Sequence, residues 1–234
     1  MTTVFLYNDN IGKVELVDSM GSDLTIVNAA RVSFGKQKES LDAKDKKLIK
    51  YLARHKHTST FEHNLVTFRC KVPLFVRSQH HRHRTWSYNE ISRRYTEVDL
   101  CFYEPDKFRT QHESNRQAST ENLINPNLNP FAERLLPVPP YLASDAIKSH
   151  HEKSLQLYNT LLDKGICREQ ARGILPQNLY TEYYATCNLN NLMKFIALRD
   201  HDGAQWEIQK LAAGMREIAS KIWPVAVSSY SNES

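Results

Sequence analysis

Apolar and polar positions follow two different periods along this chain, and each period predicts its own elements. Strict alternation from Leu65 to Val72 puts four apolar side chains on one face, which predicts a half-buried strand. Apolar positions on either side of the turn-forming segment 8–12 predict two further strands within 4–20. The Tyr- and Thr-rich segment 180–187 predicts another strand.

Apolar residues at helical spacing, bounded by capping residues and helix breakers, predict several helices. We expect Ser22 to cap a helix that starts at Asp23 and ends near Gly35. Ser40 is expected to cap the next helix, whose exposed face is rich in lysine. The remaining predicted helices cover 143–164, 168–172, 190–199 and 204–223.

A further helix is expected to have Pro73 in its first turn, where proline is well tolerated. Four of its side chains are spaced at i, i+3, i+4 and i+7 and would share one face: Gln79, Arg82, His83 and Trp86. The chain is then expected to form a loop at 87–90.

Three segments lack a clear period. Residues 55–63 predict a polar loop, and 226–234 predict a frayed tail. Residues 104–140 predict a long irregular excursion. It can be interpreted either as a mobile active-site flap or as a flexible insertion. The length suits one domain over residues 1–234, and the mixture of elements predicts an α+β fold with a mixed or antiparallel sheet and packed helices.

Composition narrows the class of protein. With 41% hydrophobic residues, no apolar run near the ~20 residues of a membrane helix, and no basic region at the N-terminus, we expect a soluble protein without a signal peptide. The four cysteines are scattered, which favours free thiols in a reducing cytoplasm. A net charge of +5 fits anionic small molecules as well as nucleic acid.

The chemistry is concentrated in residues 79–95, which hold four arginines and three histidines among interleaved aromatic side chains. Arginine suits phosphate and carboxylate groups, so the segment predicts an anion-binding surface with aromatic walls. The chain has no GxGxxG, GxxxxGK[ST] or GxSxG motif. The histidines of 55–63 lack a carboxylate or thiol at metal-binding spacing, so no metal is expected.

The pattern Arg82-His83-Arg84, seven residues, then Ser92 resembles the signature of the flavin-dependent thymidylate synthases. The wider match Ser87-x-Asn89-Glu90-x-Ser92-x-Arg94-Tyr95 and the segments 57–63 and 175–181 agree with it, and the resemblance covers roughly 23–223. It implies the fold of that family and the reductive methylation of dUMP to dTMP. The carbon donor would be methylenetetrahydrofolate, with FAD reduced by NADPH and no cysteine nucleophile. It also implies homotetramers in the cytoplasm, with active sites at subunit interfaces and neither nucleic acid nor membrane as a partner.

The resemblance also implies roles for single residues. Arg199 is the expected catalytic residue, beside the pyrimidine; its other interpretation is a cation at a helix C-terminus. Residues expected at the flavin are His57, Ser59, Arg82, His83, Arg84, Glu90, Asn188, Asn190 and Lys194, of which Asn190 and Lys194 differ from other members. Residues expected at the nucleotide are Gln79, His80, His81, Arg82, Glu90, Ile91, Ser92, Arg93, Arg94, Arg172 and Arg199.

Some alternatives stay open. Glu90 could simply pair with an arginine, and Ser92 could cap a loop. For the whole chain, the alternative class is a non-enzymatic RNA- or nucleotide-binding module that uses the basic segment as a stacking and phosphate platform. A metal hydrolase with histidine ligands is a third interpretation.

Overall fold

A computed structural model describes residues 2–96, 100–116, 118–129 and 139–230. The chain divides into two compact units. Unit 1 comprises residues 1–72, 76–90 and 182–234, and unit 2 comprises 73–75 and 91–181. That residues 1–234 form a single domain stays a prediction.

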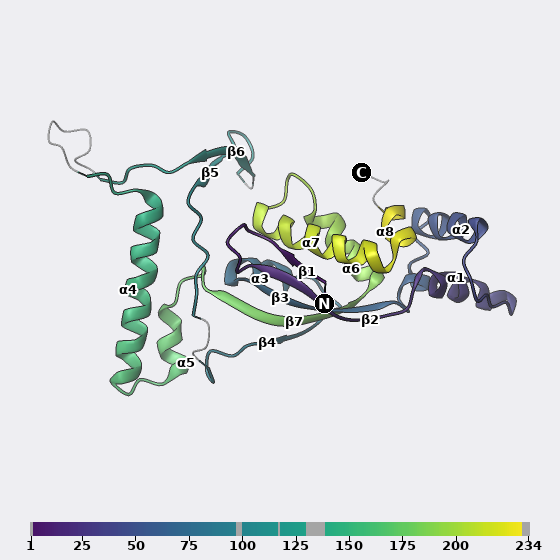
Figure 1. Cartoon of the computed structure of the whole chain (residues 1–234), viewed down its shortest axis with the longest axis horizontal. Helices are drawn as coiled ribbons and strands as arrows, with labels where there is room; N and C mark the ends of the chain where they lie inside the picture. The colour runs from purple at the N-terminus through teal and green to yellow at the C-terminus, as the bar shows by residue number, and fades with distance from the viewer. Residues whose placement is uncertain (1, 97–99, 117, 130–138, 231–234) are drawn as a thin grey trace. The chain divides into compact units, whose positions relative to one another are not determined.

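A five-stranded sheet runs through unit 1 in the order β1-β2-β3-β7-β4 (Figure 1). Its strands are β1 (Thr3–Phe5), β2 (Lys13–Met20), β3 (Leu65–Pro73), β4 (Ser87–Glu90) and β7 (Tyr180–Asn188). The pairs β1–β2, β2–β3 and β4–β7 are antiparallel. The alternating apolar positions of β3 are buried, as the alternation predicts, whereas Pro73 ends this strand instead of opening a helix.

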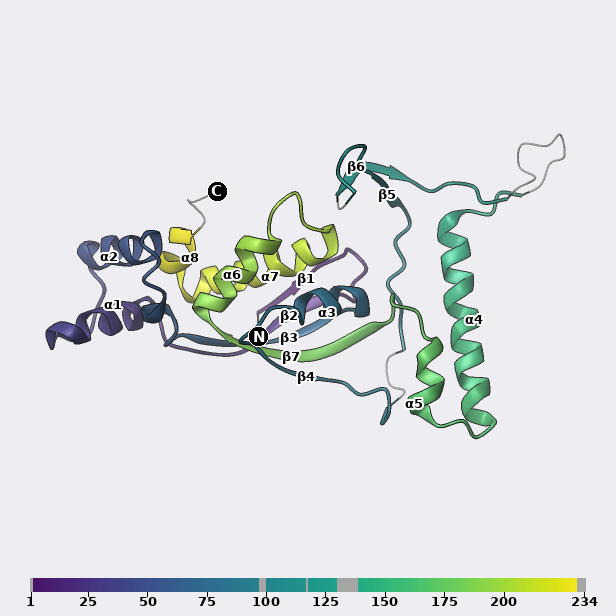
Figure 2. The same ribbon diagram turned by 180° about the vertical axis from the view of Figure 1, so that it is seen from behind.

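Helices α6 (Leu189–Arg199) and α7 (Trp206–Ile222) lie over one face of this sheet, as Figures 1 and 2 show from opposite sides. Gly214 lets α7 approach the sheet closely, because a Cβ at this position would stand 2.9 Å from a methyl group of Val14. The apolar face of α7 is buried, which confirms the helix predicted from its spacing.

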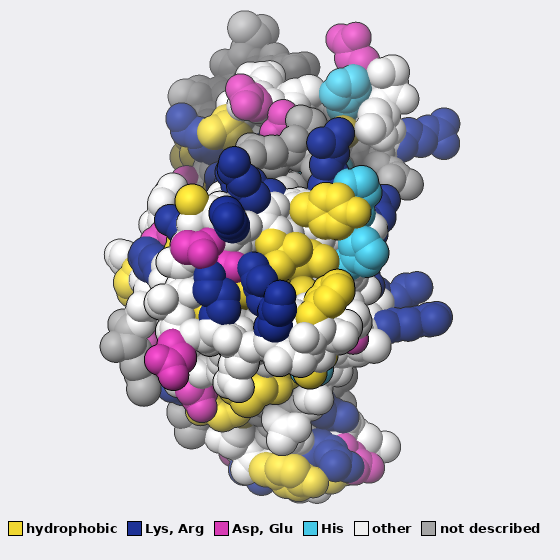
Figure 3. All heavy atoms as spheres, turned by 90° about the vertical axis from the view of Figure 1, so that its right-hand side faces the viewer, with side chains coloured by type: hydrophobic (Ala, Val, Ile, Leu, Met, Phe, Trp, Pro, Cys, Tyr) yellow, Lys and Arg dark blue, Asp and Glu magenta, His cyan; other side chains and the backbone are white. Residues whose placement is uncertain are grey.

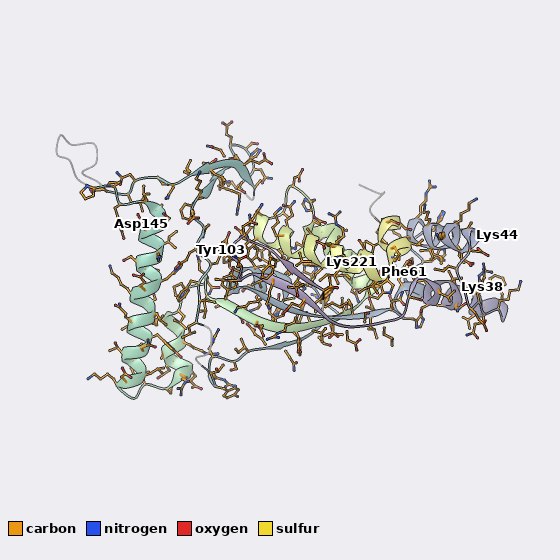
Figure 4. The ribbon with its side chains drawn as sticks, viewed as in Figure 1. Lys38, Lys44, Phe61, Tyr103, Asp145 and Lys221 are labelled. Carbon is orange, nitrogen blue, oxygen red and sulfur yellow. The ribbon has the colours of Figure 1, made fainter. Side chains whose placement is uncertain are left out.

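Two more helices of unit 1 lie between β2 and β3 in the sequence, α1 (Asp23–Arg31) and α2 (Ala43–Arg54). Ser22 precedes α1 as predicted, but the expected cap of α2 is wrong: Asp42 replaces Ser40. Asp42 accepts from the backbone of Asp45 at 2.9 Å, and Asp45 accepts from that of Asp42 at 3.1 Å. Asp45 is fully buried and pairs with Arg31 and with Lys38, the latter labelled in Figure 4, so ion pairs to the preceding segment help to fix where this helix begins.

The C-terminal segment is not a frayed tail as far as residue 230. Helix α8 (Pro224–Tyr230) follows α7 directly, and its Ala226 and Val227 are buried. The carboxylate of Asp23 accepts from the backbone of Val225 and of Ala226, both at 2.9 Å. This anion at the start of α8 anchors it, which no local pattern indicates. Residues 231–234 lie outside the described part of the chain.

The segment 55–63 is more ordered than a polar loop. Thr58–Phe61 form a short 3₁₀ helix, and Phe61, labelled in Figure 4, is buried. The ring of Phe61 meets that of Tyr230 edge-on, with centroids 5.5 Å apart. The contact of Phe61 with α8 and the bond of Glu62 to Asn190 hold this segment within unit 1.

Unit 2 contains α4 (Ala143–Asp163), α5 (Arg168–Ala171) and the hairpin of β5 (Phe108–Gln111) and β6 (Ser119–Ile124). The two helices confirm the predicted ones, and Gly165 follows α4 at φ 85°. The hydrophobic core of unit 2 is built around the buried Tyr158, Leu175 and Leu179. The prediction that 104–140 is irregular is wrong where β5 and β6 form their hairpin. Residues 117 and 130–138 of that segment lie outside the described part of the chain. No helix of the described residues has both the length and the apolar character needed to cross a bilayer.

Candidate active site

The basic segment begins on helix α3 (Leu74–His80), which ends earlier than its spacing predicts. The expected helical face with Arg82, His83 and Trp86 does not form. Residues 87–90, expected as a loop, form β4 and pair with β7. Thr85, at φ 64°, precedes this strand. The hydrogen bonds of β4 to the sheet therefore override the helical spacing.

His80 is a core residue at the root of this segment. Its ring is fully buried, its Nδ1 lies 2.8 Å from the hydroxyl of Tyr183, and it packs 4.7 Å from the ring of Phe195. Burial, with the nearby charges, holds the pKa of His80 well below its ordinary value. The hydroxyl of Tyr88 donates to the carbonyl of His80 at 3.0 Å. His80 thus fixes the segment in place, and its expected contact with a nucleotide stays a prediction.

His81 lies in a partly buried layer beside His80. Its ring is 4.1 Å from that of Tyr88, and burial and the neighbouring Arg77 lower the pKa of His81. Glu90 pairs with Arg77, Nε to Oε1 at 3.1 Å. The pairing with an arginine that the sequence left open for Glu90 is therefore present, and Arg77 is its partner.

Arg199, at the end of α6, meets the segment through a single hydrogen bond. Its Nε donates to Nε2 of His83 at 3.1 Å. Burial and the neighbouring Arg199 lower the pKa of His83 to about 4, so its ring is neutral at pH 7. Because Nε2 accepts, the proton of the neutral ring is on Nδ1. Burial lowers the pKa of Arg199 too, although a guanidinium stays charged in proteins.

The two other arginines of the signature, Arg82 and Arg84, are exposed. Gln79 is half-buried and donates to the side chain of Gln205. One neutral histidine, three guanidinium groups and an amide therefore come from a short stretch of chain and the end of α6. This donor set suits an anion next to a flat, partly polar ring.

The start of α6 carries the asparagines expected at the flavin. Asn188 caps the helix by accepting from the backbone of Asn191 at 2.9 Å. Asn190 is buried, and its amide donates to Glu62 at 3.0 Å. Lys194 is exposed further along the helix. Asn190 is thus committed to a structural contact inside unit 1.

His57 belongs to an exposed aromatic cluster at the end of α2. The rings of Tyr51 and His57 are stacked with centroids 6.1 Å apart, and His55 lies 4.2 Å from Tyr51. Ser59 is exposed in the 3₁₀ turn that follows. On the face drawn in Figure 3, histidine and hydrophobic side chains lie among Lys and Arg side chains. The cluster offers flat surfaces for a ring system.

The remaining candidates lie in unit 2. The Ser92 hydroxyl accepts from the backbone of Arg94 at 3.3 Å, which is the loop-capping role considered for it. Arg93 donates to the carbonyl of Tyr180 at 3.3 Å. The exposed guanidinium of Arg94 lies over the ring of Tyr95. Ile91 is half-buried, and Arg172 is exposed in the 3₁₀ helix Arg172–Ile174.

The two buried cysteines lack the low pKa of a reactive thiol. Cys70 and Cys187 are buried, and burial raises the pKa of both thiols. Cys101 is half-buried and Cys167 is exposed. Among the described residues, no group of three or more His, Cys, Asp or Glu side chains could hold a metal ion.

Comparison with known proteins identifies the family. Residues 15–225 match the family model Thy1, thymidylate synthase complementing protein. Over 219 residues the chain is 42% identical to a flavin-dependent thymidylate synthase of Thermus thermophilus, covering 94% of this chain and 75% of the relative. The chain belongs to the flavin-dependent thymidylate synthase family. A member from Thermosipho africanus is 41% identical over 213 residues, covering 91% of this chain and 88% of that one.

A solved structure shows the same fold. It is a UMP/dUMP methylase, PolB, from Streptomyces cacaoi bound with 5-Br dUMP. The TM-score is 0.78 at 34% identity, covering 98% of this chain and 97% of that one. The resemblance found in the sequence and the α+β fold are confirmed, and with them the expectation of an enzyme. Membership of an enzyme family decides against the non-enzymatic alternative.

Sequence reasoning about this thymidylate synthase family member missed the residues that hold the site. Arg77, Tyr88 and Phe195 contact the histidines and Glu90; Arg77 and Phe195 lie outside the segment 79–95, and Tyr88 was noted there only as one of its aromatic side chains. One signal was available for Phe195, because it lies one helical turn before Arg199 and so shares its face.

Proposed function

We propose that this protein methylates dUMP at C5 to give dTMP, with methylenetetrahydrofolate as carbon donor and FAD as cofactor. The observation that carries the proposal is the cluster of Arg82, Arg84 and the Arg199–His83 pair, in a chain that belongs to this family. The neighbour bound with 5-Br dUMP supports the nucleotide. NADPH as the source of electrons follows the family resemblance.

The residues fit a flavin nucleotide by the chemistry of their donors. Exposed Arg82 and Arg84 would hold the pyrophosphate, and the Nδ1–H of neutral His83 can donate to a ring acceptor. His57 and Ser59 would contribute a flat surface and a hydroxyl. Asn190 is left out, because it is buried and bonded to Glu62. When bound, FAD would supply the hydride needed to convert the transferred methylene carbon into a methyl group.

The chain's own part is to bind the nucleotide and to stabilise charge. Arg94, Arg172 and the Ser92 hydroxyl would bind the phosphate of dUMP. Arg199 would lie beside the pyrimidine, where its fixed positive charge favours loss of the N3 proton and makes C5 more nucleophilic. The raised pKa of the buried thiols supports a route in which no cysteine attacks the ring.

The proposal includes a homotetramer in the cytoplasm, with active sites at subunit interfaces. Exposed apolar side chains support an assembly, since Val32 and Phe34 are 72% and 77% exposed. The scattered cysteines support the reducing compartment.

Binding spectra test the proposal. FAD is added to the purified protein, and its absorbance is recorded with and without dUMP. We expect a bound flavin spectrum that shifts on addition of dUMP. Because PolB is described as a UMP/dUMP methylase, the same titration is repeated with UMP in place of dUMP for comparison. A protein that leaves the spectrum of free FAD unchanged contradicts the proposal.

A further inference from the structure

The guanidinium of Arg199 is held at its base. Its Nε–H donates to Nε2 of His83 at 3.1 Å, which leaves the four N–H groups on the two terminal nitrogens. Because the group is planar, one bond at Nε fixes the direction in which the terminal fork points. Without an acceptor at this position, the half-buried side chain could adopt other rotamers.

His83 is itself held from two sides. Its ring stands edge-on to that of Phe195, with centroids 4.8 Å apart, and its backbone N–H donates to the carbonyl of His80 at 3.0 Å. Phe195 and Arg199 are four residues apart on α6 and so share one face of the helix. His83 therefore bridges two consecutive turns of that helix, and the buried His80 anchors the turn behind it.

The ring can play this part only in its neutral form. An imidazolium has a donor on both nitrogens and cannot accept from Arg199. Two cations at this distance also repel each other. Burial and Arg199 keep the pKa of His83 near 4, so the acceptor is present at neutral pH.

We propose that His83 is a positioning residue for Arg199: it accepts from Nε and thereby aims the terminal guanidinium fork at the pyrimidine. The role rests on the proposed function, in which Arg199 acts on dUMP. It differs from a direct contact between His83 and the flavin, because the effect of His83 passes through Arg199.

Two substitutions separate the acceptor from the ring. His83→Phe keeps a ring against Phe195 but removes the acceptor, whereas His83→Gln places an amide oxygen within reach of the position of Nε2. We expect His83→Phe to lose about 10- to 100-fold in kcat, the scale of a misaligned catalytic group, with the KM for dUMP and the Kd for FAD within about 3-fold of wild type. His83→Gln should recover most of kcat. His150→Phe, an exposed histidine of unit 2, is the matched control.

A double-mutant cycle with Arg199→Ala decides whether the effect passes through Arg199. Rates are measured with enzyme in excess, so that slow turnover is resolved. In the Arg199→Ala background, we expect His83→Phe to cost less than about 2-fold further, because the group to be positioned is gone.

Equal losses in both backgrounds, or a loss of FAD affinity that accounts for the fall in rate, would overturn the inference while dTMP formation by the wild type upholds the proposed function. A wild-type protein that forms no dTMP would overturn the proposed function, and with it the role given to His83.

Discussion

Removing Arg199 should damage catalysis far more than folding. Within the described part of the chain, Arg199 makes one hydrogen bond, to a neutral ring, and it lies at the C-terminus of α6. A hydrogen bond to a charged group contributes about 1.5–3 kcal/mol, and a cation at a helix end about 0.3–1 kcal/mol. Because the side chain is only half-buried, we take the low end of both, a total of about 2 kcal/mol. For a chain of this size, that lowers Tm by roughly 4–8 °C.

The expected loss in kcat/KM is at least about 100-fold, the order seen when one electrostatic stabiliser of a transition state is removed. Arg199→Ala should therefore fold, bind FAD and turn over slowly. Arg199→Lys keeps the charge without the planar fork, so its rate should fall between those of wild type and Arg199→Ala. The assay is dTMP formation at varied dUMP, with thermal unfolding recorded on the same samples.

Arg216→Ala is the matched control. Arg216 pairs with Asp200, next to Arg199, at 2.8 Å, and its side chain is 46% exposed. Exposed pairs contribute about 0.2–1 kcal/mol, so this variant should lose little stability and no activity. Near-normal turnover of Arg199→Ala, with only the fall in Tm, would refute the reasoning and leave Arg199 a structural role.

Three further predictions follow from the site. Replacing all four cysteines by Ala should leave dTMP formation measurable; they are Cys70, Cys101, Cys167 and Cys187. Complete loss of activity in a well-folded single variant would argue for a cysteine nucleophile. Ser92→Ala should raise the KM for dUMP more than it lowers kcat, since it removes ground-state binding; a trapped covalent adduct on Ser92 would contradict this. The pKa of His83 is about 4 in the folded protein against an ordinary value near 6.5, so the unfolded chain binds more protons between these values and stability falls as pH drops from about 6.5 toward 4. Burial and the neighbouring Arg199 oppose protonation of His83, so His83→Gln should show a smaller loss of unfolding free energy between pH 7 and pH 5 in urea titrations; equal losses would contradict the low pKa.

Local pattern was enough for most of the fold. Alternation in β3 predicts burial because one face of a strand meets the core, and apolar spacing in α7 does the same for a helix. The errors lie where distant contacts decide. Asp45 sets the start of α2 through its buried ion pairs, and Asp23 anchors α8 from the other end of the chain. The partners of Asp45 lie 7 and 14 positions away without a helical or strand spacing to mark them, and Asp23 lies 202 positions from Val225.

For the candidate site, too, local pattern identified the residues but not their positions in the fold. The arginines and histidines could be named from their motif, but their placement could not. The helical spacing of Gln79 and His83 predicts one face, yet pairing of β4 with β7 ends α3 at His80. The bond between Arg199 and His83 joins residues 116 positions apart, so only the fold reveals it.

The most direct test of the central claim is dTMP formation by one protein sample with its flavin removed and then restored. The sample receives dUMP, methylenetetrahydrofolate and NADPH throughout, and dTMP is quantified by chromatography. The proposed function predicts no dTMP without FAD and recovered turnover when FAD is added back. Full-rate dTMP formation by the colourless, flavin-free protein would contradict it.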